Sequence, residues 1–161
     1  GPGKRKRKSM TIIPFDPKYR QQFKEMNLEW LEHFFHVEPH DEEVLGNPEK
    51  YIIEPGGSIF FVKDNEKILG TVALMKMEDG IFELTKMAVS TEARGKNIGQ
   101  KLMKFALDYA REQGWKKLII YSNRKLENAI HIYRKFGFEE IPIEKNGPYS
   151  RGDIKMELLL S

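Results

Sequence analysis

The sequence contains no cysteine, and this absence removes several kinds of chemistry. A chain without cysteine forms no disulfide and holds no zinc ion through thiolate ligands. A mechanism that passes through a covalent cysteine intermediate is excluded for the same reason. Any catalysis must therefore depend on other side chains and on the backbone.

Long apolar segments are also missing. No run of apolar residues approaches the roughly 20 that are needed to cross a bilayer. No apolar segment of signal-peptide length follows the basic N-terminus either. We therefore expect a cytoplasmic protein without a membrane partner. The chain has 161 residues, 40% of them hydrophobic, which suits a single domain with its own core.

Positive charge is concentrated in one short segment. Residues 4–8 supply five of the 27 basic side chains, and the rest of the chain carries 22 basic and 24 acidic ones. A basic tail of this kind can bind nucleic acid or direct nuclear import. Here it follows Gly1 and precedes Met10, a natural start. We therefore interpret residues 1–9 as a remnant added for expression, residues 10–161 as the domain, and expect no nucleic-acid partner.

The spacing of apolar residues and turn residues predicts an α/β protein with a mixed sheet. Strands are expected over residues 11–15, 58–63, 68–77, 81–89, 117–121, 138–143 and 153–160. Helices are expected over residues 18–36, 42–45, 98–113 and 126–136, with Gly114 and Gly137 ending the last two. The order is therefore β-α-α-β-β-β-α-β-α-β-β. A strand–helix–strand crossover in the middle implies one parallel pair, and the hairpins imply antiparallel pairs.

The stretch from Glu83 to Gly99 is the most informative part of the sequence. It is predicted to form a buried strand, a polar turn, a basic loop with two glycines, and the start of a helix. Free amides at a helix N-terminus favour phosphate, so we expect this loop to bind a pyrophosphate. The P-loop sequence Gly-Lys-Ser/Thr is absent, and the loop follows an antiparallel meander rather than the first strand of a dinucleotide fold.

The loop Arg94-Gly95-Lys96-Asn97-Ile98-Gly99 resembles the Arg/Gln-x-x-Gly-x-Gly/Ala motif of the GNAT acetyltransferase superfamily. Residues 128–138, which include Ala129, Tyr133, Gly137 and Phe138, are similar to that family's Ala-x-x-x-Tyr-x-x-x-Gly-Phe segment. The resemblance covers about residues 58–161 and implies a GNAT-like fold in which a central mixed sheet is flanked by helices. Asn97 stands where the family has its first motif glycine. Asparagine tolerates a positive φ, so we expect the loop to keep its shape.

The resemblance implies an acyltransferase that uses acetyl-CoA, with no metal ion. It implies that the pyrophosphate binds the loop amides and that pantetheine pairs with the strand before the loop, where the sheet splays open. The implied cofactor-binding residues are Met87, Ala88, Val89, Arg94, Gly95, Lys96, Asn97, Ile98, Gly99, Gln100 and Tyr133. Leu126 stands where many relatives have an asparagine, so of the nearby Asn123 and Asn128 we expect Asn123 to contact pantetheine. Because cysteine is absent, we expect the acetyl group to move by direct attack of a primary amine in a ternary complex.

The resemblance also implies catalytic residues. Tyr133 matches the general acid that protonates the departing thiolate, and the Met87 N–H matches the donor to the thioester oxygen. Glu83 matches a general base, and strand alternation is expected to place Glu83, Thr85 and Met87 on one face. Glu54, the acidic residues of segment 38–43 and a water relay remain alternative bases. Tyr133 could also be a core residue, and Glu83 a charge at a strand end.

Other features leave alternatives open. His33, His36, Glu38, His40 and Asp41 could ligate a metal ion, but their spacing matches no known motif, so ordinary surface residues are the preferred interpretation. The acidic residues in this segment could instead attract a cationic amine. We expect acceptor specificity to come from segments 18–57 and 144–151, which do not identify the amine. A non-catalytic acyl-CoA sensor of the same fold is the alternative function, and a monomer or a homodimer is expected.

Overall fold

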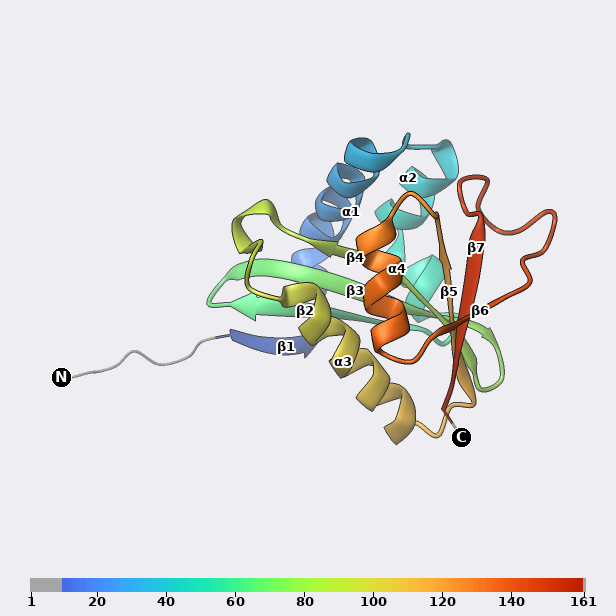
Figure 1. Cartoon of the computed structure of the whole chain (residues 1–161). Helices are drawn as coiled ribbons and strands as arrows, with labels where there is room; N and C mark the ends of the chain where they lie inside the picture. Colours follow the sequence, from blue (N-terminus) through green and yellow to red (C-terminus); the bar gives the residue numbers. More distant parts are fainter. Residues whose placement is uncertain (1–9, 161) are drawn as a thin grey trace.

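The computed structural model describes residues 10–160 as a seven-stranded sheet with helices on both faces (Figure 1). The strands are β1 (Met10–Pro14), β2 (Ser58–Asp64), β3 (Lys67–Glu78), β4 (Ile81–Val89), β5 (Lys117–Ser122), β6 (Glu139–Ile141) and β7 (Ile154–Leu159). The α-helices are α1 (Arg20–Phe34), α2 (Pro39–Gly46), α3 (Ile98–Glu112) and α4 (Glu127–Lys135). Three short helical turns are η1 (Pro17–Tyr19), η2 (Glu49–Ile53) and η3 (Thr91–Ala93). The basic tail, residues 1–9, lies outside the described residues.

The sheet has the strand order β1-β2-β3-β4-β5-β7-β6. The β4–β5 pair is parallel, and the other neighbouring pairs are antiparallel. The crossover through α3 produces the parallel pair, because a strand–helix–strand unit returns the chain in its original direction. The expected mixed sheet and element order are therefore confirmed.

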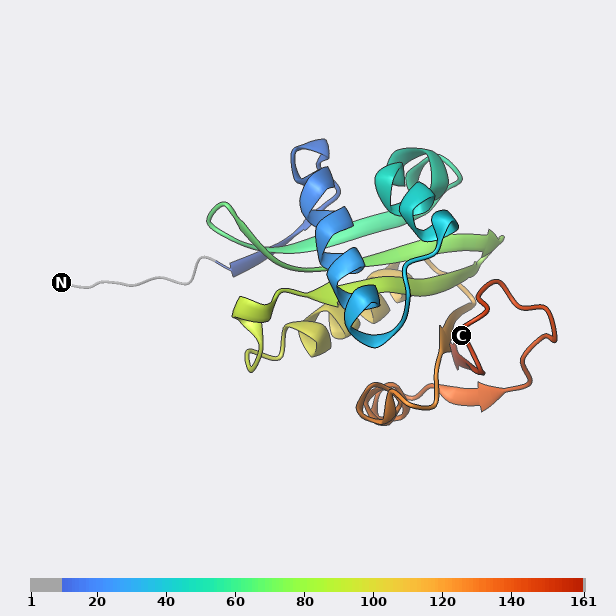
Figure 2. The same cartoon turned by 90° about the horizontal axis from the view of Figure 1, so that it is seen from above.

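Two apolar clusters, one on each face of the sheet, form the core. Along β2, Ile59 and Phe61 face α1, whereas Phe60 and Val62 face α3, as strand alternation requires. The helices α1 and α2 cover the first face, and α3 and α4 cover the second (Figure 2). Each face of the sheet is therefore covered by its own pair of helices.

The N-terminal helices differ in detail from the expectation of one helix over 18–36 and another over 42–45. The first begins with the 3₁₀ turn η1, where the Asp16 side chain accepts the Lys18 amide at 2.9 Å. The second starts earlier, at Pro39, where the preceding Glu38 amide donates to the Asp41 carboxylate at 2.9 Å. The spacing of apolar residues in the sequence did not predict the turn η2. Near the C-terminus β6 is shorter than the expected 138–143, because Pro142 supplies no amide to a ladder.

The two glycines expected at helix ends adopt the predicted conformation. Gly114 has φ +75° after α3, and Gly137 has φ +104° after α4. Left-handed backbone of this kind closes the last helical turn and favours glycine. Among the described residues, no helix is both long enough and apolar enough to cross a membrane.

Candidate functional site

The site lies where β4 and β5 separate. These parallel strands pair only from Ile81 to Glu83 on β4 and from Lys117 to Ile119 on β5. Beyond this point β4 continues to Val89 while it pairs with β3 on its other side. The sheet therefore opens along one edge of β4, as the family resemblance implied, and Figure 1 shows α4 beside this opening.

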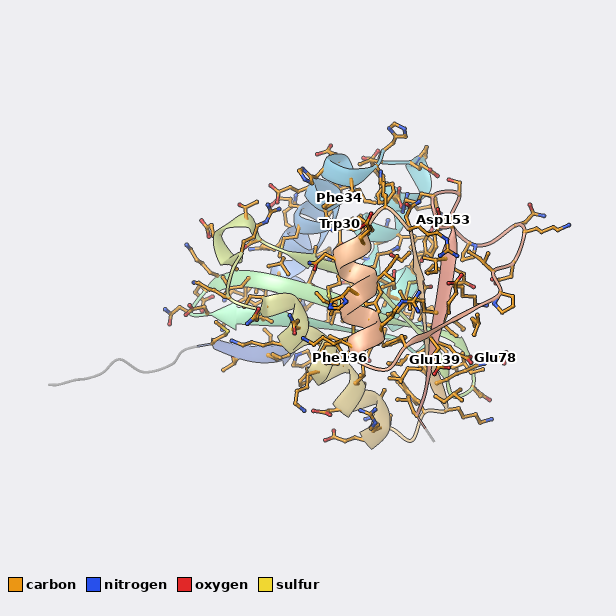
Figure 3. All side chains as sticks on the ribbon, in the orientation of Figure 1. Trp30, Phe34, Glu78, Phe136, Glu139 and Asp153 are labelled. Atoms are coloured by element: carbon orange, nitrogen blue, oxygen red, sulfur yellow. The ribbon has the colours of Figure 1, made fainter. Side chains whose placement is uncertain are left out.

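A cavity occupies the opening, and both faces of the sheet contribute to it. Its lining residues come from α1, α2, β4, β5, α4 and the loops before α4 and β7. They include Asn27, Trp30, Leu31, Phe35, Leu84, Thr85, Lys86, Met87, Tyr121, Asn123, Leu126, Tyr133, Tyr149 and Arg151. Figure 3 marks Trp30 in the last part of α1 and Phe136 at the end of α4, the helices that contribute from opposite faces.

A bulge in β4 changes the face of the sheet on which the following side chains lie. The register with β3 shifts between Thr71 and Ala73, and Lys86 on the facing stretch has φ +54°. After this irregularity Met87 packs in the α3 cluster, whereas Thr85 pairs with Ala73 of the α1 cluster. The expectation that Glu83, Thr85 and Met87 share one face is therefore wrong for Met87, because the extra residue at the bulge interrupts the alternation.

The predicted phosphate loop has the backbone conformation that was expected for it. Asn97 has φ +56° and ψ +33°, and α3 begins at the next residue, Ile98. Gly95 has φ +85°, and nothing lies within 4 Å of the position that a β-carbon would take. Arg94, Lys96 and Asn97 are exposed. The first amides of α3 thus stand behind an open, basic loop, which suits a phosphate group.

Tyr133 lies on α4 and lines the cavity. Burial raises the pKa of its hydroxyl above the ordinary tyrosine value, so the group is protonated near neutral pH. Its ring packs at the edge of the α3 cluster, 6.3 Å from the centre of the Phe138 ring. The packing holds Tyr133 in place, and a protonated hydroxyl at the cavity wall can donate a proton.

Glu83 is 7% exposed, but it does not itself line the cavity. The Tyr149 hydroxyl, which does line it, donates a hydrogen bond to Glu83 Oε2 at 2.9 Å. Burial raises the pKa of Glu83, although Lys86, Tyr149 and Thr85 each act to lower it. A carboxyl with a raised pKa is better matched to proton transfer near neutral pH. Any proton that it takes from the cavity must travel through a neighbouring group or a water.

Among the described residues, the cationic side chains that line the cavity are Lys86 and Arg151. Arg151 donates through both terminal nitrogens to Asp41, at 3.0 and 2.6 Å. Burial alone would raise the pKa of Asp41, but the bond from Arg151 and the Glu38 amide hold it below its ordinary value. Burial lowers the pKa of Lys86, against the opposing effect of Glu83 and Asp41.

The loop before β7 is tied to the start of α2 by side-chain contacts. Next to the Asp41–Arg151 pair, the Ser150 hydroxyl donates to Glu38 at 2.9 Å. Sequence reasoning assigned this loop to acceptor specificity but identified none of Lys86, Tyr149 or Arg151. No motif marked them, because their partners are up to 110 residues away. The acidic residue Asp41 neutralises Arg151 instead of being free to attract an amine.

Asn123 follows β5 and lines the cavity, as expected for a residue near pantetheine. Its Nδ2 donates to the Arg151 carbonyl at 2.8 Å, and its Oδ1 accepts the Lys125 amide at 2.9 Å. It therefore anchors the loop before β7, and its contact with pantetheine stays a prediction. Within residues 10–160, no group of three or more histidine or acidic side chains is arranged to hold a metal ion.

Comparisons with known proteins agree with this geometry. Residues 20–138 match the model of the acetyltransferase (GNAT) family. The chain is 33% identical over 91 residues to the uncharacterised N-acetyltransferase YjgM of Escherichia coli, a match that covers 55% of this chain and 54% of YjgM. It is 26% identical over 95 residues to human N-acetyltransferase 8B, which covers 56% of this chain and 42% of that protein. The chain thus spans about half the length of these curated relatives.

Solved structures share the fold at low sequence identity. A GNAT-family acetyltransferase from Staphylococcus aureus superposes with a TM-score of 0.83 at 22% identity, over 94% of this chain and 99% of that one. A spermidine N-acetyltransferase from Vibrio cholerae, solved with CoA and spermine, gives a TM-score of 0.71 at 21% identity, over 94% and 96% of the two chains. At these identities the likeness establishes the fold.

Proposed function

The chain belongs to the acetyltransferase (GNAT) family, and on that premise we propose that it transfers an acetyl group from acetyl-CoA to a primary amine. The transfer is a direct attack of the amine on the thioester in a ternary complex. The observation that carries the proposal is the opening between β4 and β5. Thr85 and Tyr133 line this opening, and the open loop that we assign to phosphate follows β4 in the chain.

The fit of acetyl-CoA rests on two parts of the opening. The β4 backbone beyond Glu83 faces away from β3 without a β5 partner, so its peptide groups can pair with the peptide-like pantetheine arm. The amides from Gly95 to Gln100 can then bind the pyrophosphate, with Arg94 and Lys96 adding positive charge. Bound in this way, acetyl-CoA supplies the activated acyl group.

The residues at the inner end of the opening have distinct roles. The Met87 N–H donates to the thioester oxygen as negative charge develops there. Tyr133 donates its proton to the sulfur as the carbon–sulfur bond breaks. Glu83 accepts the proton that the amine must lose, by way of the Tyr149 hydroxyl or a water, since Glu83 lies behind the cavity wall.

Two measurements test the proposal. Isothermal titration should detect acetyl-CoA binding at micromolar affinity or better, and a thiol-release assay should detect turnover with at least one amine of a broad panel. Tight binding without turnover on any amine would favour the acyl-CoA sensor over the enzyme. The absence of heat at high acetyl-CoA concentration would contradict both.

A further inference from the structure

The charges on the cavity wall indicate the chemistry of the acceptor. Within residues 10–160, the charged side chains that line the cavity are Lys86 and Arg151, and no aspartate or glutamate lines it. Glu83 and Asp41 are close by but lie behind Tyr149 and Arg151, with which they are hydrogen bonded. A molecule in the cavity therefore meets cationic groups first.

The two cations are not equivalent. Arg151 forms a two-bond pair with Asp41, so its charge is largely matched within the protein. In the part of the chain that is described, Lys86 has no carboxylate at salt-bridge distance, although the charges of Glu83 and Asp41 act on it from farther away. Its ammonium instead stands 5.2 Å from the centre of the Tyr149 ring. Lys86 is thus the cation that can accept an anionic partner from outside the protein.

The position of Lys86 makes this partner part of the acceptor rather than of acetyl-CoA. The phosphates are assigned to residues 95–100, and none of these residues lines the cavity. Lys86 directly precedes Met87, whose N–H is assigned to the thioester oxygen. Lys86 lines the same cavity as Trp30, Leu31 and Phe35, whose side chains form an apolar wall. An anion at Lys86 therefore lies beside the reacting amine and next to an apolar surface.

We propose that the acceptor is an α-amino acid with an apolar side chain, whose carboxylate binds Lys86 and whose side chain contacts the wall from α1. This inference rests on the proposed acetyltransferase function. A polyamine fits the cavity poorly, because its second ammonium group would meet Lys86 and Arg151 rather than a carboxylate. Binding of the carboxylate also favours the charged form of Lys86, which burial otherwise disfavours.

The test is a thiol-release assay with matched acceptors: L-phenylalanine, L-phenylalaninamide, phenethylamine and spermidine. We expect kcat/KM for phenylalanine to exceed that for its amide by about 10-fold or more, the effect of one charged hydrogen bond. The α-amine of phenylalaninamide is less basic than that of phenylalanine, so a larger fraction of it is neutral at a given pH. A preference for phenylalanine therefore cannot come from the ionisation of the amine. Turnover in which the amide or spermidine equals or exceeds the acid would overturn the inference and leave the acetyltransferase function standing.

Variants identify Lys86 as the source of the preference. Lys86→Gln should bring the acid-to-amide ratio close to one, whereas Lys86→Arg should keep it above one. Lys104→Gln is the matched control, because Lys104 pairs with Asp108 on the exposed side of α3, and it should leave the ratio unchanged. A Lys86→Gln ratio equal to that of wild type would also overturn the inference. Acetyl-CoA binding without turnover on any of the four amines or on a broader panel would contradict the inference together with the enzyme itself.

Discussion

Tyr133 is the single residue through which the proposed chemistry is most directly tested. Tyr133→Phe removes the proton donor while it keeps the ring that packs near Phe138. We expect kcat to fall by about 100-fold, the lower end of the range for a general acid, with acetyl-CoA affinity unchanged. Steady-state kinetics and isothermal titration measure the two effects. Tyr109→Phe, on the buried side of α3 and outside the cavity, is the control, and wild-type turnover by Tyr133→Phe would refute the assignment.

Glu83 and Tyr149 form a pair whose effect is visible in the pH dependence. Burial raises the pKa of Glu83, so kcat/KM should decline on acidification at a pH above the ordinary carboxyl range. The hydrogen bond from Tyr149 opposes that rise. Tyr149→Phe should therefore move the acidic limb to still higher pH, and Glu83→Gln should abolish it. A limb that survives in Glu83→Gln would assign the base to Glu54, the acidic segment 38–43 or a water relay.

At the scale of one element, the start of α3 depends on the left-handed backbone of Asn97. Asparagine reaches φ +56° at lower cost than other residues with a side chain, and glycine reaches it at almost none. Asn97→Ala should therefore destabilise the loop by about 1 kcal/mol and weaken acetyl-CoA binding. Asn97→Gly should bind acetyl-CoA at least as tightly as wild type.

Isothermal titration of both variants measures the loop's affinity, and chemical unfolding measures its stability. The matched pair separates backbone conformation from a contact made by the asparagine side chain. Equal weakening in the alanine and glycine variants would assign the effect to the side chain. The two variants thus test whether backbone conformation alone accounts for the proposed binding of phosphate at the start of α3.

At the scale of the whole molecule, the Asp41–Arg151 pair joins α2 to the loop before β7, two segments 110 residues apart in the chain. Asp41→Asn should lower the free energy of unfolding by about 1–3 kcal/mol at neutral pH and raise the KM of the acceptor. Folding lowers the pKa of Asp41, so its stabilising effect is present above the unfolded value of about 3.9 and is lost as the pH falls through the folded value.

Urea unfolding at several pH values measures this effect. The difference between wild type and Asp41→Asn should shrink on acidification below the ordinary carboxyl range. Glu42→Gln, on the exposed side of α2, is the matched control and should unfold like wild type. A pH-independent difference would show that the variant acts through packing and not through the ion pair.

The sequence alone determined the order of the elements and the family. Apolar spacing is a local property, so the crossover through α3, the mixed sheet and the helix ends at Gly114 and Gly137 could be predicted, and they are confirmed. The loop before α3 could be predicted for the same reason, because its shape depends on Asn97 and its neighbours. The roles of its residues, of Tyr133 and of Glu83 stay predictions.

The tertiary structure alone decided which groups line the cavity and which groups stand behind its wall. The Tyr149–Glu83 bond spans 66 residues of sequence, and the Asp41–Arg151 pair spans 110. Such contacts leave no periodic pattern in the chain. The bulge at Lys86 was equally hidden, because it depends on the register between β3 and β4 and not on the residues of β4 alone. Local sequence therefore set the backbone of the loop before α3, and long-range packing set the lining of the cavity.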